Sequence, residues 1–164
     1  GSNMKLASGV APVGKLIASG VTVGLGTDGS SSNNNLDMFE EMRLASLLHK
    51  VANFDAVAVP AYTSLKMATI EGAKCLGLDY NIGSIETGKR ADIAIVDFNQ
   101  PHLVPRTDIL SHLVYSAGGA DVITVVVDGK VVMENRKIMT VDEEEVMEEV
   151  NFRAKKLLSG SNVD

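Results

Sequence analysis

The pattern of hydrophobic and polar positions predicts a first half made of helices and one strand. Apolar residues recur at helical spacing over residues 36–51 and again over residues 60–76. A proline near its start favours a shorter helix over residues 12–19. The β-branched run over residues 21–26 predicts a buried strand, and Asn35 is expected to cap the helix that follows. The expected order is therefore helix, strand, helix, helix.

The second half changes to strand patterns. Residues 91–97, 122–127 and 130–134 are rich in β-branched residues, and Asp128-Gly129 is a strong signal for a two-residue hairpin turn. We expect these three segments to form one antiparallel sheet that excludes residues 21–25. Two helices complete this half: a short one beginning near Asp108 and an acidic amphipathic one over residues 141–158.

A single strand in the first half is unusual for a folded domain. A strand must pair with another strand, and an α/β core needs several of them. Residues 21–26 have no second strand pattern near them in the first half. This half therefore has the character of a piece of a larger sheet or barrel.

Composition and charge narrow the class of protein. The chain has 164 residues, 45% apolar and 22% charged, which is typical of one soluble globular domain with a sizeable core. Its net charge of −6 argues against nucleic acid or an anionic membrane as a partner. The apolar runs are too short to span a bilayer and no secretory signal is visible, so a cytoplasmic protein is expected. The lone Cys75 excludes an internal disulfide and is expected to be a small buried apolar residue.

Asp28 carries the strongest chemical signal in the sequence. It follows the predicted strand in the stretch Gly24-Leu25-Gly26-Thr27-Asp28-Gly29, and small serines come directly after it. A carboxylate at the C-terminal end of a buried strand, with nothing bulky beside it, can reach a metal or a substrate. The simpler alternative is a turn-forming aspartate, since Asp-Gly pairs are common in turns. The local pattern leaves both interpretations open.

The same stretch also spells G-x-G-x-x-G, which raises the alternative of a dinucleotide site. That motif requires a helix to begin at the third glycine, so that its N-terminus meets the pyrophosphate. Here six Ser and Asn residues delay the helix, and Asp28 would place a carboxylate where phosphate must lie. We interpret the match as accidental.

Other candidate ligands are weaker. The three histidines, His49, His102 and His112, are not spaced as a metal-ligand pair, and each is expected to be structural. The acidic residues from 143 to 149 are expected to form a solvated helix face, because their spacing is not that of a calcium loop.

Three stretches, taken in this order, resemble the amidohydrolase superfamily. The branch is that of the 5-methylthioadenosine/S-adenosylhomocysteine deaminases and chlorohydrolase-like enzymes. Residues 2–13 resemble the segment after the seventh barrel strand of that family. Gly24-Leu25-Gly26-Thr27-Asp28-Gly29 with residues 33–43 resembles the eighth strand and its loop. Residues 83–93 resemble the return into the family's small β-sandwich domain, so the resemblance covers nearly the whole chain.

The resemblance implies an α/β fold. Residues 1–79 would supply the last strand and helices of a metal-dependent (β/α)₈ barrel. Residues 80–164 would supply part of a composite β-sandwich domain with a C-terminal helix. A complete barrel needs about 250 residues, so the chain is expected to be a C-terminal fragment of a longer parent protein. Open strand edges are then expected to make the isolated chain a homo-oligomer.

The resemblance also implies the chemistry of the parent. The family's metal is held by a His-x-His pair, a further histidine and an aspartate on the eighth strand, and Asp28 matches that aspartate. Asp28 would be both a metal ligand and the catalytic base toward the attacking water. The resemblance implies that the parent is a metal-dependent hydrolase of C–N bonds, with zinc as the expected metal. Its small-molecule substrate would be an adenine nucleoside such as methylthioadenosine or S-adenosylhomocysteine.

The chain also departs from the family pattern. The histidine ligands have no counterpart in it, so the chain alone is expected to be inactive and to hold no metal stably. The alternative from another class is a self-standing structural or interaction module, without catalysis, built on residues 80–158.

Overall fold

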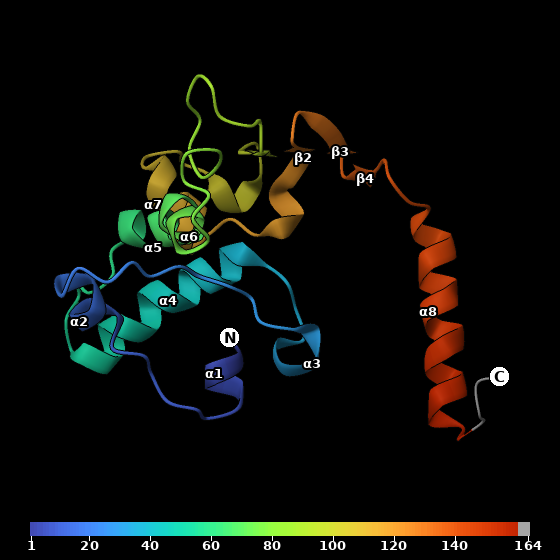
Figure 1. Ribbon diagram of the computed structural model, residues 1–164, viewed down its shortest axis with the longest axis horizontal. Coiled ribbons are helices and arrows are strands. Elements are labelled where there is room, and N and C mark those ends of the chain that lie inside the picture. The colour runs from blue at the N-terminus through green and yellow to red at the C-terminus, as the bar shows by residue number, and fades with distance from the viewer. Residues whose placement is uncertain (161–164) are drawn as a thin grey trace.

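The computed structural model describes residues 1–160, and residues 161–164 of the expected second domain lie outside them. The N-terminal part of the chain forms a helical body, a small sheet lies at one end of it, and a long helix extends away (Figure 1). The helices of the first half are α1 (Ser2–Lys5), α2 (Val13–Ala18), α3 (Ser30–Asn33), α4 (Met38–Asn53), α5 (Ala61–Ala68) and α6 (Ile70–Cys75). The fold is mixed α/β, with helices first and strands later.

The second half contains a four-stranded antiparallel sheet whose strands neighbour each other in chain order. The strands are β1 (Ile93–Val96), β2 (Val122–Val127), β3 (Lys130–Glu134) and β4 (Lys137–Ile138). Val125 in β2 pairs with Ala94 in β1 and with Met133 in β3. The predicted hairpin is confirmed: Asp128 and Gly129 join β2 to β3 with φ of 50° and 76°. The sheet excludes residues 21–25, as expected, while β4 is an addition that the sequence pattern does not predict.

Short turns and two helices accompany the sheet. These are η1 (Pro101–Leu103), α7 (Ile109–Tyr115), η2 (Gly119–Asp121) and α8 (Glu143–Leu158), where η denotes a 3₁₀ helix. The short helix expected near Asp108 is confirmed, and the Asp108 carboxylate caps α7 by accepting the N–H of Leu110 at 3.0 Å. No residue of α8 is buried, and this helix stands apart from the helical body (Figure 1). Within residues 1–160, no helix is long and apolar enough to cross a membrane.

The core lies within the helical body. A buried cluster there consists of Val13, Val59 and Met67, with Val23 and Leu25 packed against it. Two fully buried serines connect neighbouring segments through their hydroxyls. Ser46 donates to the carbonyl oxygen of Val59 at 2.8 Å, and Ser64 donates to that of Met42 at 2.6 Å. These bonds satisfy polar atoms that would otherwise be costly to bury.

The strand expected over residues 21–26 is wrong. The N–H of Leu25 donates to the carbonyl oxygen of Met67, and that of Val21 donates to Leu16, both at 3.0 Å. Gly24 lies against Gly72 of α6, close enough that an added Cβ would sit 3.1 Å from the Gly72 Cα. A strand requires a hydrogen-bonded neighbouring strand, and the described part of the chain provides none beside this segment.

The expected N-cap of α4 is also wrong. Asp37, not Asn35, caps this helix, accepting the N–H of Phe39 at 2.8 Å. An ionised carboxylate is a stronger acceptor than an amide oxygen. The side-chain nitrogen of Asn35 donates instead to the carboxylate of Glu40.

Residues 60–76 form two helices rather than the single one expected. Thr69 separates α5 from α6, with φ of −127° and ψ of −102°. Its hydroxyl donates to the carbonyl oxygen of Leu65 at 2.7 Å, a type of contact that commonly bends helices. Cys75 at the end of α6 is exposed, which corrects the expectation of a buried thiol. Cys75 is one of the residues that line an open groove.

Candidate functional site

Asp28 lies in the loop between residues 21–26 and α3, and its side chain is exposed. Its φ of 61° is in the left-handed region, which few residues other than glycine adopt. The Asp28 Oδ1 accepts the backbone N–H of Gly29 at 2.7 Å. This bond, with the hydroxyls of Ser32 and Ser2, holds the pKa of the Asp28 carboxyl below its usual value. The carboxylate is therefore ionised at neutral pH, as a metal ligand must be.

Two residues that sequence reasoning missed lie beside this loop. The side-chain nitrogen of Asn33, at the end of α3, is 2.8 Å from the carbonyl oxygen of Thr27 and 2.9 Å from Glu41 Oε1. Glu41 is buried on α4, next to the buried Met42. The available signal was a glutamate beside an apolar position of the predicted helix, where an acidic side chain is rarely buried without partners.

The three histidines lie away from Asp28 and have other partners. His49 is buried, with Nδ1 2.6 Å from the carbonyl oxygen of Ala45 and Nε2 3.0 Å from that of Ala11. His102 and His112 lie in the second half of the chain. The Nε2 of His102 is 3.0 Å from Asp121 Oδ2, and the Nδ1 of His112 is 2.7 Å from the carbonyl oxygen of Asp108. These contacts agree with structural roles for all three.

Asp28 does not belong to a cluster of metal-ligating side chains within the described residues. Within residues 1–160, no group of three or more His, Cys, Asp or Glu could hold a metal ion. A zinc site in proteins takes three or four protein ligands. The exposed, ionised Asp28 therefore fits as one ligand of such a site, and the other ligands would have to come from outside the described residues.

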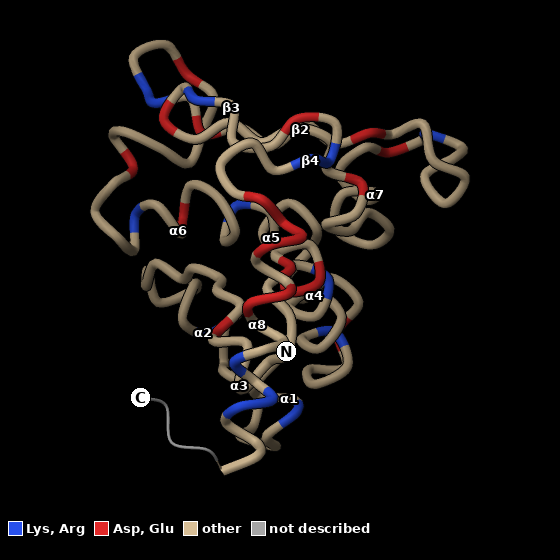
Figure 2. Tube along the Cα trace, turned by 90° about the vertical axis from the view of Figure 1, so that its right-hand side faces the viewer, with Lys and Arg blue, Asp and Glu red and all other residues tan. Residues whose placement is uncertain are grey.

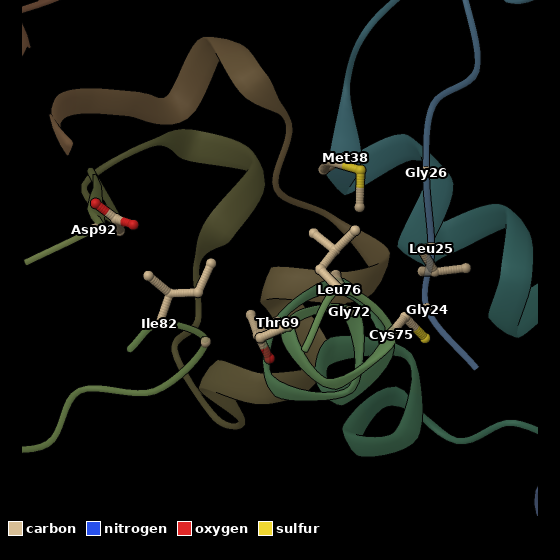
Figure 3. A pocket seen from close by; sticks show the side chains of 13 residues that line it. Gly24, Leu25, Gly26, Met38, Thr69, Gly72, Cys75, Leu76, Ile82 and Asp92 are labelled. Atoms are coloured by element: carbon tan, nitrogen blue, oxygen red, sulfur yellow. The ribbon is translucent and has the colours of Figure 1, made fainter. Parts of the chain in front are cut away.

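An open groove of about 680 Å³ runs along Gly24, Leu25 and Gly26 (Figure 3). Residues of α6 form its other wall, and Cys75 lies close to Gly24 in that view. The lining is mostly apolar, with Asp92 at the far end near Ile82 (Figure 3). Asp28 does not line this groove, so the groove and the candidate carboxylate are separate features.

The Lys and Arg residues of the described chain are distributed over several elements, whereas acidic residues are concentrated over residues 142–149, along the first part of α8 (Figure 2). This distribution, with a net charge of −6 over the whole chain, gives no electrostatic attraction for a polyanion.

Comparison with known proteins shows where this chain belongs. Residues 1–132 match the family model described as the amidohydrolase family. A 5-methylthioadenosine/S-adenosylhomocysteine deaminase of Pelotomaculum thermopropionicum is 55% identical over 158 residues, which are 96% of this chain and 36% of the relative. A 5′-deoxyadenosine deaminase of Methanosarcina acetivorans is 53% identical over 161 residues, 98% of this chain and 37% of the relative. The chain thus spans about a third of the length of these relatives.

Solved structures give the same result. An adenosine deaminase from Xanthomonas campestris with bound zinc superposes with a TM-score of 0.94 at 39% identity, covering 96% of this chain and 36% of that chain. An atrazine chlorohydrolase from Arthrobacter aurescens, complexed with zinc, superposes with a TM-score of 0.82 at 32% identity, covering 92% and 34%. The mixed α/β arrangement therefore matches part of these larger structures. By sequence and by fold, this chain belongs to the amidohydrolase family.

Proposed function

We propose that the chain is the C-terminal part of a metal-dependent amidohydrolase that deaminates an adenine nucleoside, such as methylthioadenosine or S-adenosylhomocysteine. The observation that carries this proposal is the 55% identity to a deaminase of that specificity over 96% of the chain. Asp28 is compatible with the proposal, because an exposed, ionised carboxylate can act as one ligand of a metal ion.

In this proposal Asp28 has two roles. As an ionised oxygen ligand it would help to hold a divalent ion, with zinc favoured because solved relatives contain it. When bound, zinc supplies Lewis-acid chemistry that makes water a competent nucleophile at neutral pH. The Asp28 carboxylate would take the proton released by the attacking water and pass it toward the departing ammonia. Its lowered pKa keeps the carboxylate ionised at neutral pH, which is the form that binds a cation.

The arrangement of the first half supports the proposal that this chain supplies only part of a barrel. We propose that residues 1–79 complete a (β/α)₈ barrel and that residues 80–164 belong to a β-sandwich domain. The segment over residues 21–26 is partly buried, no strand of residues 1–160 pairs with it, and the apolar groove follows one of its sides. A neighbouring barrel strand in that groove would supply the missing hydrogen bonds and cover the apolar lining.

A chimera tests the proposed function. The matching 158-residue region of the Pelotomaculum deaminase is replaced by the corresponding residues of this chain, and the deamination of methylthioadenosine and S-adenosylhomocysteine is measured. We expect an active, zinc-containing chimera. Asp28→Asn should leave its circular dichroism unchanged and lower kcat by at least 10³-fold, because an amide neither carries the charge nor accepts the proton.

Two controls make the result decisive. Asp79→Asn, a carboxylate far along the chain from the loop, should keep kcat within twofold. A folded chimera with zinc but no deaminase activity would contradict the proposed function and favour a structural module. Full activity in Asp28→Asn would remove Asp28 from the mechanism.

A further inference from the structure

Glu41 is a buried carboxylate whose oxygens both have hydrogen-bond donors. Only 8% of the residue is exposed. Its Oε1 accepts from the side-chain nitrogen of Asn33 at 2.9 Å, and its Oε2 accepts from the N-terminal nitrogen of Gly1 at 2.8 Å. A buried carboxylate is costly unless it is paired in this way. This arrangement fixes the position of the Asn33 amide against α4.

Asn33 in turn holds the backbone on both sides of Asp28. Its side-chain nitrogen donates to the carbonyl oxygen of Thr27, the preceding residue, at 2.8 Å. Its backbone N–H donates to the carbonyl oxygen of Gly29, the following residue, at 2.9 Å. The side-chain amide has two hydrogens, so it can donate to Thr27 and to Glu41 at the same time. Asn33 therefore bridges the loop across Asp28, and Glu41 anchors the bridge.

Asp28 needs such support because its backbone conformation is unfavourable. Left-handed φ values persist in residues other than glycine when the surroundings enforce them. A ligand or base must also be held to within about 0.5 Å of its working position. Asp28 is exposed, and its carboxyl has hydrogen-bond partners in Gly29, Ser32 and Ser2. The bridge through Asn33 connects the backbone of this loop to α4.

We propose that Glu41 and Asn33 are positioning residues that orient the Asp28 carboxylate for metal binding and proton transfer. The proposal rests on the proposed role of Asp28. Neither residue would touch the substrate. Their effect would pass through the backbone of Thr27 and Gly29, in the way that outer hydrogen-bond partners orient metal ligands in other proteins.

The first experiment measures the backbone order of the loop in the 164-residue chain. It does not require deaminase activity. Backbone {¹H}–¹⁵N NOE values of residues 27–34 and the side-chain amide resonances of Asn33 are compared in wild type, Glu41→Leu, Glu41→Gln and Asn33→Ala. We expect Glu41→Leu and Asn33→Ala to lower the NOE values of this loop while those of α4 stay unchanged. Glu41→Gln should restore most of the order, because its amide oxygen can still accept from Asn33.

The second experiment measures catalysis in the chimera described above. Glu41→Leu and Asn33→Ala should lower kcat by about 10- to 100-fold, the usual effect of removing an outer partner, with KM within twofold. Glu41→Gln should recover kcat to within about fivefold of wild type. The matched control is Glu71→Leu: Glu71 lies in the first turn of α6, paired with Lys74 at 3.0 Å, and the same substitution there should leave kcat unchanged.

The outcomes separate this proposal from the proposed function. An ordered loop in Glu41→Leu and Asn33→Ala overturns the positioning role, and so does a disordered loop with unchanged kcat. An inactive wild-type chimera contradicts the deaminase function, and the NMR result then decides by itself whether the bridge holds the loop. Asn33→Ala keeps the test valid if Glu41→Leu does not fold, because Asn33 lies in the loop and is only partly buried.

Discussion

The carboxylate of Asp37 accepts a hydrogen bond from a residue 82 positions away, because its Oδ2 accepts the N–H of Gly119 at 2.9 Å. Its Oδ1 caps α4 through the N–H of Phe39 at 2.8 Å. One side chain thereby connects the helical body to η2, the turn that leads into β2. A second connection lies nearby, where Arg43 Nη2 donates to the carbonyl oxygen of Ala117 at 2.5 Å.

Asp37→Ala should therefore destabilise the protein more than the loss of a helix cap alone. A cap is worth about 1 kcal/mol, and the lost bond to Gly119 should add about another 1 kcal/mol. The control is Asp108→Ala, which removes the cap of α7 but no bond to a distant segment. Urea unfolding measures both free energies. Equal losses in the two variants would show that the Gly119 contact contributes nothing.

Gly83→Ala should destabilise the fold far more than Gly88→Ala. Both glycines have positive φ, 90° and 94°, so the backbone strain of an alanine is similar at the two positions. Only Gly83 is also enclosed: an added Cβ would lie 2.8 Å from the Ala73 Cβ and 2.9 Å from the Ile70 Cα, whereas Gly88 has nothing within 4 Å. We expect an extra loss of about 1–3 kcal/mol in Gly83→Ala, measured by thermal unfolding. Similar melting temperatures would contradict this packing.

Asp121 should make the stability depend on pH in the acid range. Burial raises the pKa of its carboxyl, but the hydrogen bonds from His102 and the Gly118 N–H, with the charges of His102 and Arg136, outweigh burial and lower the pKa. Folding therefore favours the ionised form. This contribution is fully present above the unfolded pKa of about 4 and is lost as the pH falls through the lower, folded value.

To test this, the melting temperatures of wild type and Asp121→Asn are measured at a series of pH values from 7 into the acid range. Wild type should be the more stable protein at pH 7, and the difference should shrink once the pH falls below about 4. Glu149→Gln, which breaks an exposed pair with Arg153 on α8, should show a smaller difference throughout. If the difference in melting temperature between wild type and Asp121→Asn stayed the same at acid pH, the ionised carboxylate would not be its source.

Zinc should bind the isolated chain only weakly, because one carboxylate cannot replace a site of three or four ligands. Isothermal titration should show no binding tighter than about the millimolar range, and Asp28→Asn should reduce it further. Stoichiometric zinc that resists a chelator would mean that this chain forms a complete site by itself.

The isolated chain should self-associate. Residues 21–26 have no strand partner in the described part of the chain. Apolar side chains along and after α4 are open to solvent, with Val51 72% and Phe54 97% exposed. Such surfaces favour pairing between copies. Sedimentation velocity at micromolar concentration should show a dimer or larger species, which Phe54→Ser should weaken. A monomer across the concentration range would refute this expectation.

The parts of the fold that depend on neighbouring residues could be predicted from the sequence. The hairpin at Asp128 and Gly129 follows from two residues that accept positive φ between two β-branched runs. The start of α7 follows in the same way from the carboxylate of Asp108, which reaches the first free N–H groups of its own helix. Local pattern singled out Asp28 but left a turn-forming role open, and the family resemblance added the ligand role, which stays a prediction.

Only the tertiary structure decided which segments meet. Residues 21–26 have the composition of a strand, yet pairing depends on a partner distant in sequence, and none lies beside them in the described residues. Cys75 has an apolar helical setting, but the groove on its side of α6 leaves it exposed. The hydrogen bonds that link Glu41 through Asn33 to the backbone around Asp28 could not be predicted from the sequence either, because they form only when α4 packs against the loop. Periodicity and turn chemistry act over a few residues and are determined by the sequence alone, whereas burial and long-range hydrogen bonds depend on which surfaces the folded chain brings together.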